Sequence, residues 1–436
     1  MESSVRVHWG RLRSSALVQN ILSLYGVQVA SYAAPLVTVP YLARVLGPYH
    51  WGLVAFAQSF AMYTALIVEF GFSLSATREV ASDRHDRRKL ANIFTRVIGA
   101  KTVLSAVCVL VGTAIVIWVP QFREKKILMY AAVASGVAQA YNVAWFYQGL
   151  ERMRVSSMID IVGKSLFALS VFIFVHSSND DWRVLCLQAF WYGAAALILT
   201  VNVHREFPLE WPAMQHIKEA LKSSASMFLY RSAVTLYTTV NTLLLGFFAT
   251  PVSVAYFAAA EKINVATMAA VIPLSQAIYP RMNHLIQKDE RAAARLARSS
   301  VLLNLSLGCL LCAASYVFAP LFVRILFGNS YAPVVPLVRI MALLLPIVAT
   351  NIVLGCQCML PLRLDRQFNI ITIVAGVFNI GMALLLVPRY SYFGMAWSVV
   401  LTQVLVTACQ LGVLVRRAPH FLFGVVTRAP AGATGP

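Results

Sequence analysis

Long apolar runs recur along the whole chain, and they restrict its fold more than any other feature does. Each run is long enough for a helix to cross the roughly 30 Å of bilayer hydrocarbon. Apolar residues make up 59% of the chain and charged residues 12%, a composition unlike that of a soluble domain. We expect twelve membrane-spanning helices, near residues 16–43, 51–76, 93–119, 127–149, 157–175, 184–203, 223–249, 253–280, 299–326, 335–360, 367–388 and 393–415.

The connections between these runs are too short to form a soluble domain, the longest being residues 77–92, 204–222 and 281–298. We therefore expect an all-α integral membrane protein. Lys and Arg are unevenly divided between alternate connections: those on the side of both termini carry 23, and the opposite ones carry seven. Because basic residues near span ends are retained in the cytoplasm, both termini are expected there. Three of the seven exceptions form one cluster, Arg123, Lys125 and Lys126.

The net charge of +19 follows from this topology and from attraction to anionic membrane lipids, so nucleic acid is not an expected partner. The seven cysteines lack His or acidic neighbours at metal-ligand spacing. We therefore expect no metal site, no cofactor and no disulfide framework.

A weak internal repeat relates the two halves of the chain. A shift of 203 residues places segment 47–58 on segment 250–261 and aligns polar residues, Gln28 with Arg231 and Gln58 with Glu261. Transporters are often built from such halves, with the substrate site at their interface. We expect two six-helix lobes around a central cavity, with boundaries at 1–203 for the N-terminal lobe, 204–222 for a cytoplasmic connecting loop, 223–415 for the C-terminal lobe and 416–436 for a disordered cytoplasmic tail.

Nine ionisable residues inside the expected spans are candidates for function, because each costs about 2.5–3.5 kcal/mol on insertion scales and therefore faces a cavity or a partner. Six are basic and three acidic: Glu69, Arg96, Lys101, Asp160, Lys164, Arg231, Glu261, Lys262 and Arg339. Arg96 and Arg339 lie near span ends and are expected at the membrane interface. The other four cations predict a positive cavity that binds a phosphate or diphosphate, formed by Arg231, Lys262, Lys101 and Lys164.

The three acids are candidates for coupling to a proton or sodium ion, or for charge balance: Glu261, Asp160 and Glu69. A structural interpretation stands beside this one. Asp160 and Lys164 are four residues apart on one helix face and are able to pair, and Glu261 is able to pair with Arg231. Glu261 and Lys262 point about 100° apart on a helix, so only one of them faces a cavity directly.

The segments PLVTVPYLARVLGPYHWGLVAFAQSF (35–60) and EFGFSLSATREVA (69–81) precede a basic loop. This opening resembles the O-antigen flippases, members of the polysaccharide transporter family within the multidrug/oligosaccharidyl-lipid/polysaccharide exporter superfamily. The segment AAAEKI (258–263) fits the same pattern at the start of the second half.

The resemblance implies that the protein moves an undecaprenyl-diphosphate-linked oligosaccharide, an O-antigen or exopolysaccharide repeat unit, from the cytoplasmic to the periplasmic leaflet of a bacterial inner membrane. It implies alternating access, a cationic lumen and coupling to an ion gradient, as in an antiporter. It also implies membrane lipids as surroundings, and a polysaccharide polymerase and a chain-length regulator as functional partners.

Three alternatives belong to neighbouring classes. A peptidoglycan-precursor flippase would typically carry more than twelve spans, and a multidrug exporter would favour an acidic lumen. A membrane glycosyltransferase or polymerase acting on lipid-linked sugars would need a sizeable outer loop with catalytic groups, and the expected outer loops are short. The sequence therefore favours a transporter over an enzyme.

Overall fold

The computed structural model describes residues 37–118, 125–207 and 212–419, without the side chains of residues 230, 233, 234 and 236–238. All regular structure in these residues is helical, and they contain no strand. Inside a bilayer each backbone N–H and C=O must find a partner within the protein, and a helix meets this requirement within its own segment. The expected all-α class is confirmed.

The chain divides into two compact units, and the division falls between Ala258 and Ala259. This position lies inside helix α10 (Pro251–Met268) and not in the expected connection 204–222. That connection is also shorter than expected, because α8 continues to Glu206 and α9 begins at Met214. Segment 214–222 is rich in Lys, Glu, Leu and Ala, which favour a helix. The lobe boundaries themselves stay a prediction.

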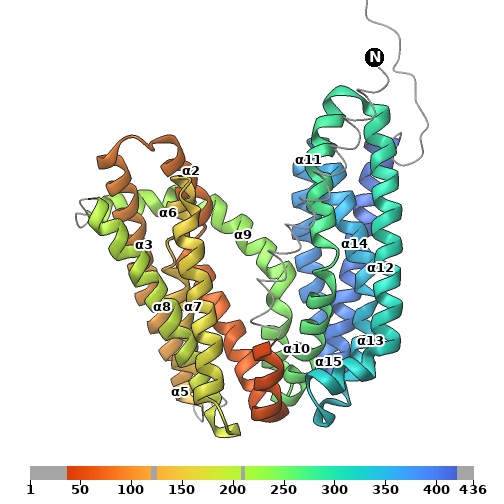
Figure 1. Cartoon of the computed structure of the whole chain (residues 1–436), viewed down its shortest axis with the longest axis horizontal. Coiled ribbons are helices and arrows are strands. Elements are labelled where there is room, and N and C mark those ends of the chain that lie inside the picture. The colour runs from red at the N-terminus through yellow and green to blue at the C-terminus, as the bar shows by residue number, and fades with distance from the viewer. Residues whose placement is uncertain (1–36, 119–124, 208–211, 420–436) are drawn as a thin grey trace, which may run out of the picture. The chain divides into compact units, whose positions relative to one another are not determined.

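The first unit begins with a long helix, residues 37–69, which turns into α2 at Gly71. Gly71 has a positive φ of 77°, and a Cβ there would lie 2.7 Å from the backbone nitrogen of Phe228 in α9. Glycine therefore permits both the turn and the close packing of α9. The helices of this unit appear in Figure 1 and are α2 (Phe72–Ser82), α3 (Arg87–Trp118), α5 (Lys126–Ala140), α6 (Ala144–Gly149), α7 (Met153–Phe174), α8 (Asp181–Glu206), α9 (Met214–Phe248) and the start of α10.

The second unit contains the rest of α10 and a bundle in which α12 packs along α13 and α14. Helices α10 and α11 are bent by 46° relative to each other. The non-helical backbone of Ser391 divides α15 into two apolar segments. The remaining elements are α11 (Ile272–Lys288), α12 (Glu290–Leu326), α13 (Val334–Ala342), α14 (Leu344–Ile352), a π-helical segment (Val353–Met359) and α15 (Asp365–Arg417).

The described residues contain eight helices long and apolar enough to cross a membrane, or nine if the bent pair α10 and α11 forms one span. One of the eight, α15, covers the two expected spans 367–388 and 393–415, and α9 covers the expected span 223–249. Most of the expected span 16–43 lies outside the described residues. The structure is consistent with twelve spans, and this number stays a prediction.

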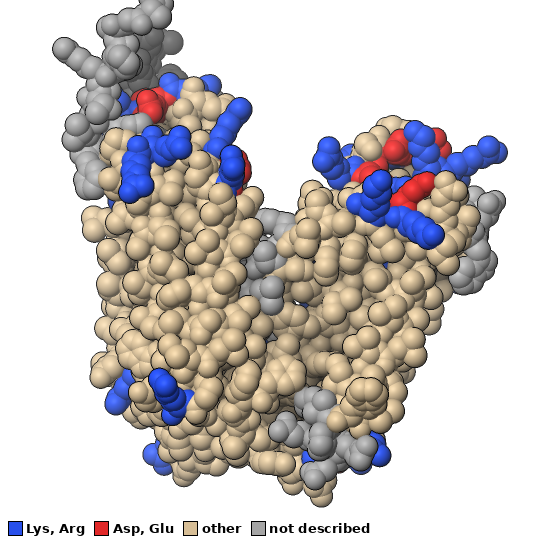
Figure 2. Space-filling view, turned by 180° about the vertical axis from the view of Figure 1, so that it is seen from behind, with Lys and Arg blue, Asp and Glu red and all other residues tan. Residues whose placement is uncertain are grey.

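Charged residues gather toward the ends of the helices in each unit, with an uncharged belt between them on the face seen in Figure 2. Large apolar side chains are widely exposed: Leu110, Leu302 and Val377 expose 70%, 69% and 69% of their surface. Soluble proteins rarely tolerate extensive apolar surfaces, whereas hydrocarbon does. The protein is therefore a multi-pass membrane protein.

Neutral polar side chains join three helical segments inside the second unit. The Ser275 hydroxyl of α11 donates to Asn304 Oδ1 of α12 at 3.1 Å, and the Ser300 hydroxyl donates to Gln357 Oε1 at 2.6 Å. Asn304 Nδ2 in turn donates to the Ser300 carbonyl at 2.9 Å. All four side chains are buried. The network holds α11, α12 and the π-helical segment together without placing a charge in the bundle.

Replacement of Ser300 by alanine tests this network, because it removes the hydroxyl that donates to Gln357. We expect Ser300→Ala to lose about 1–2 kcal/mol of stability. The measurement is the midpoint of thermal unfolding of the purified protein in detergent. Ser306→Ala is the matched control, since Ser306 lies on the same helix with an exposed side chain. An unchanged midpoint for Ser300→Ala would contradict a stabilising role.

Candidate functional site

Arg231 of α9, the first of the predicted substrate residues, lies beside the start of α2. Its Nη1 donates to the Ser73 hydroxyl at 3.2 Å, and its Nε is 3.9 Å from Glu69 Oε2. The Arg231 side chain is 42% exposed and that of Glu69 is 17% exposed. Arg231 is thus partly balanced by Glu69 and still has an accessible face. Its predicted alternative partner, Glu261, belongs to the other unit, and that pairing stays a prediction.

Glu69 has a local structural role as well. Its carboxylate accepts hydrogen bonds from the backbone N–H of Gly71 at 3.2 Å and of Ser73 at 2.5 Å. These N–H groups lie at the start of α2, where the helix leaves donors without internal partners and favours a negative charge. Glu69 also interacts electrostatically with Lys101. The structure therefore gives Glu69 a charge-balancing position, and its part in ion coupling stays a prediction.

Lys101 of α3 is completely enclosed, with 0% of its surface exposed. Its Nζ donates to the Ala140 carbonyl at 2.7 Å and lies 5.9 Å from the centre of the Trp145 ring. The carbonyl belongs to the last turn of α5, where helix carbonyls lack internal partners and favour a cation. In this structure Lys101 joins α3 to α5, and contact with a substrate would require this packing to open.

Asp160 and Lys164 of α7 line a cavity of about 140 Å³ inside the first unit. Asn142 Nδ2 donates to Asp160 Oδ1 at 2.9 Å, and Tyr192 of α8 also lines the cavity. No ion pair joins Asp160 to Lys164, although the structure describes both side chains. The amide of Asn142 satisfies the acid in place of the predicted partner. The cavity therefore presents a carboxylate and an ammonium group together with neutral polar groups.

Of the two repeat-related glutamines, only Gln58 lies in the described residues. Gln58 Nε2 donates to Gln188 Oε1 of α8 at 3.4 Å, whereas Gln28 lies outside the described residues. Gln188 is four residues before Tyr192, so both lie on one face of α8. Sequence reasoning missed Gln188, Tyr192 and Asn142 because it considered only charged residues and the polar residues that the repeat relates. Polar side chains four residues apart in an apolar run were the available signal.

Glu261 and Lys262 lie in the second unit, on α10. The Lys262 side chain is exposed, and that of Glu261 is half-buried. Their assignments to substrate binding and to ion coupling stay predictions. In the described residues no group of three or more His, Cys, Asp or Glu side chains could hold a metal ion, and the seven cysteines are free thiols.

Two relatives of this chain are described as transporters. Over 402 residues it is 28% identical to a protein of Escherichia coli (strain K12) described as "Putative O-antigen transporter", covering 91% of this chain and 96% of that protein. A protein of Shigella dysenteriae with the same description is 26% identical, covering 90% of this chain and 98% of its own length.

Solved structures of similar fold are also transporters. The lipid II flippase MurJ in an inward closed conformation matches with a TM-score of 0.73 and 11% identity, over 90% of this chain and 87% of that one. An inward-facing multidrug resistance transporter of the MATE family, within the MOP superfamily, matches with a TM-score of 0.68 and 13% identity, over 91% and 97% of the two chains. At these identities the likeness shows the fold.

A family model described as polysaccharide biosynthesis protein matches residues 17–286. This match spans more than half of the chain and includes the Glu69, Arg231 and Asp160 sites. The chain therefore belongs to the polysaccharide biosynthesis protein family.

Proposed function

We propose that this protein is a flippase, and not an enzyme, that moves a lipid-linked oligosaccharide across a bacterial inner membrane. The observation that carries the proposal is the match to two O-antigen transporters along nearly the full length of both chains. The fold shared with MurJ supports it, because that protein is described as a lipid II flippase. The substrate would be an undecaprenyl-diphosphate-linked O-antigen or exopolysaccharide repeat unit, moved by alternating access.

The charges of the first unit support an anionic substrate. Among the described residues, Glu69 lies 3.9 Å from Arg231 and interacts electrostatically with Lys101, so these three groups together carry one positive charge in excess. Arg231 presents an accessible guanidinium, which suits a diphosphate because its donors are arranged as a planar fork. We propose that Arg231 and Lys262 contact the diphosphate. Lys164 is a further candidate, and Lys101 acts through the electrostatic field of the cluster.

We propose transport from the cytoplasmic to the periplasmic leaflet, the direction that the family resemblance implies, in a protein whose termini are both cytoplasmic. Coupling to a proton or sodium gradient would drive net movement of this large anionic substrate in one direction. Asp160 is the favoured coupling group, because its carboxylate lines a polar cavity and has an accepting oxygen beyond the one that Asn142 occupies. Glu261 is the alternative.

Deletion of the gene in its own host tests the proposed substrate. We expect loss of the surface polysaccharide and accumulation of undecaprenyl-diphosphate-linked repeat units on the cytoplasmic side, because synthesis continues while transfer stops. Extracted lipid-linked sugars and surface polysaccharide are measured together, with the restored gene as control. Unchanged polysaccharide combined with higher sensitivity to cationic drugs would instead indicate a multidrug exporter.

The cationic site is tested by Arg231→Ala and Lys262→Ala. We expect each change to lower surface polysaccharide by about tenfold or more, because a charge-assisted contact to phosphate is lost. Protein in the membrane should stay at its normal level, as measured by immunoblot. Arg152→Ala is the control, since the 2.6 Å pair of Arg152 with Glu206 is exposed and contributes little. Normal polysaccharide in both site variants would contradict the proposal.

Ion coupling is tested by Asp160→Asn. Asparagine retains an oxygen that accepts from Asn142, but it neither binds a proton nor carries a charge. We expect transport of lipid-linked oligosaccharide in vesicles to lose its response to an imposed proton or sodium gradient. Asp83→Asn is the control, because Asp83 forms an exposed pair with Lys89 at 2.8 Å. An unchanged response of Asp160→Asn would exclude Asp160 as the coupling group.

A further inference from the structure

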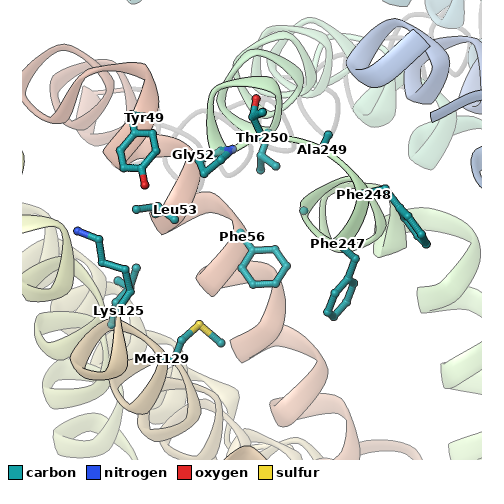
Figure 3. A pocket seen from close by; sticks show the side chains of 14 residues that line it. Tyr49, Gly52, Leu53, Phe56, Lys125, Met129, Phe247, Phe248, Ala249 and Thr250 are labelled. Carbon is teal, nitrogen blue, oxygen red and sulfur yellow. The ribbon is translucent and has the colours of Figure 1, made fainter. Parts of the chain in front are cut away.

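An apolar pocket of about 490 Å³ lies in the first unit, at the end opposite the basic segment 83–89. Most of its lining is apolar, including Leu53, Phe56, Met129 and Phe247. Figure 3 shows Lys125 and Tyr49 at one side of this pocket, and Phe247 and Phe248 at the other. This volume lies within the range of pockets that bind small molecules. The pocket therefore combines a large apolar space with one cation at its side.

Close packing of two helices forms one wall of this pocket. A Cβ on Gly52 would lie 1.7 Å from the Pro251 carbonyl oxygen of α10, so only glycine fits there. The rings of Phe56 and Phe247 are 5.6 Å apart in a T-shaped arrangement. Gly52 and Phe56 lie in segment 47–58 and Pro251 in segment 250–261, the two segments that the 203-residue repeat relates. The wall is thus built from side chains and backbone held at fixed distances.

Lys125 has hydrogen-bonding capacity beyond the contact it makes. Its Nζ is 3.4 Å from Asp181 Oδ2, and that oxygen also pairs with His50 Nδ1 at 2.8 Å. The other oxygen of Asp181 accepts from the Trp182 N–H at 2.8 Å. An ammonium group has three donors, and among the described residues this one makes a single long contact. The carboxylate is shared among several donors, which leaves Lys125 able to bind a further anion.

The position of Lys125 is not explained by topology or by helix stability. Lys125, Lys126 and Arg123 are the basic cluster that departs from the bias toward the cytoplasmic side. Lys125 is also the N-cap of α5, where the helix dipole disfavours a cation and where its side chain makes no capping bond. The 3.4 Å contact with Asp181 compensates for this position only in part, so an anionic ligand would also stabilise Lys125 here. The chemistry of the pocket identifies that ligand as an anion with an apolar chain.

The geometry points to a binding site for the carrier-lipid end of the substrate at the outer face of the membrane, with a phosphate on Lys125 and the first isoprenoid units against Phe56 and Phe247. This inference rests on the proposed function and orientation. The substrate reaches this face after transfer, still attached to an apolar chain that must remain in hydrocarbon. The pocket would hold the phosphate near the outer interface while the rest of the chain extends into lipid.

Photo-crosslinking of the full-length protein in nanodiscs tests the inference with a diazirine-labelled farnesyl diphosphate. We expect labelled peptides from segments 125–129 and 246–254. Lys125→Gln should reduce this labelling by about fivefold or more, and Lys125→Arg should retain most of it, because a charge-assisted contact is lost in the first case and kept in the second. Leu53→Trp should also reduce labelling by filling the pocket.

Lys126→Gln is the matched control, since Lys126 is adjacent and exposed but does not line the pocket. Its labelling should remain within about twofold of the native protein. Thermal unfolding of each variant is measured alongside, so that labelling is compared only among folded proteins. An equal loss in Lys126→Gln and Lys125→Gln would overturn the site, as would an absence of labelling in both segments.

Two further experiments distinguish the carrier lipid from other phosphate-containing ligands. Diazirine-labelled phosphatidylglycerol should label these segments several-fold less, and excess inorganic diphosphate should compete only weakly because it lacks the apolar chain. Equal labelling by phosphatidylglycerol would overturn the inference in favour of a general lipid site. If the native gene restores surface polysaccharide while no labelling occurs, this inference fails alone. If the native gene does not restore surface polysaccharide, the proposed function fails.

Discussion

A polar group left unpaired in hydrocarbon is strongly destabilising, and this constraint determines how buried polar side chains are arranged in both units. The second unit meets this constraint with neutral groups, since Ser275, Ser300, Asn304 and Gln357 satisfy one another inside the bundle. The first unit meets it with ions, around Glu69 and around Asp160. A buried charge is more expensive than a buried amide, so ionic clusters would not be needed merely to hold helices together. The ionic clusters of the first unit, like Glu261 and Lys262 on α10 of the second, therefore favour a function beyond packing.

The carboxylate of Glu69 interacts with backbone N–H groups and with cations at the same time. It accepts two backbone N–H groups at the start of α2, lies 3.9 Å from Arg231 and interacts with Lys101. A carboxylate oxygen engaged by backbone donors neutralises nearby cations only in part. The cluster therefore stays positive as a whole, which would attract a diphosphate and would also repel cationic drugs. This balance separates the proposed function from that of a multidrug exporter.

The all-α class, most span positions and the ionisable residues inside spans could be predicted from sequence, because hydropathy over a span reports the cost of each residue in lipid. The residues with which these ionisable groups interact could not be predicted. Sequence reasoning paired near neighbours, Asp160 with Lys164, whereas the structure pairs Asp160 with Asn142 and Arg231 with Glu69. These contacts join different helices, and lateral packing between helices leaves no periodic signal in the sequence. The onset of α9 at Met214 was likewise hidden, because its first turns are polar.

A basic residue on the outer side of the membrane departs from the positive-inside rule, and its position therefore needs a separate explanation. A basic residue on the cytoplasmic side needs no explanation beyond the bias itself, whereas Lys125 departs from that bias and from the preference of helix N-termini. Lys126 departs from the same bias one residue later, yet it does not line the pocket. The two residues share charge and local sequence. They differ in whether an apolar space lies beside the ammonium, and that difference separates a ligand contact from a tolerated surface charge.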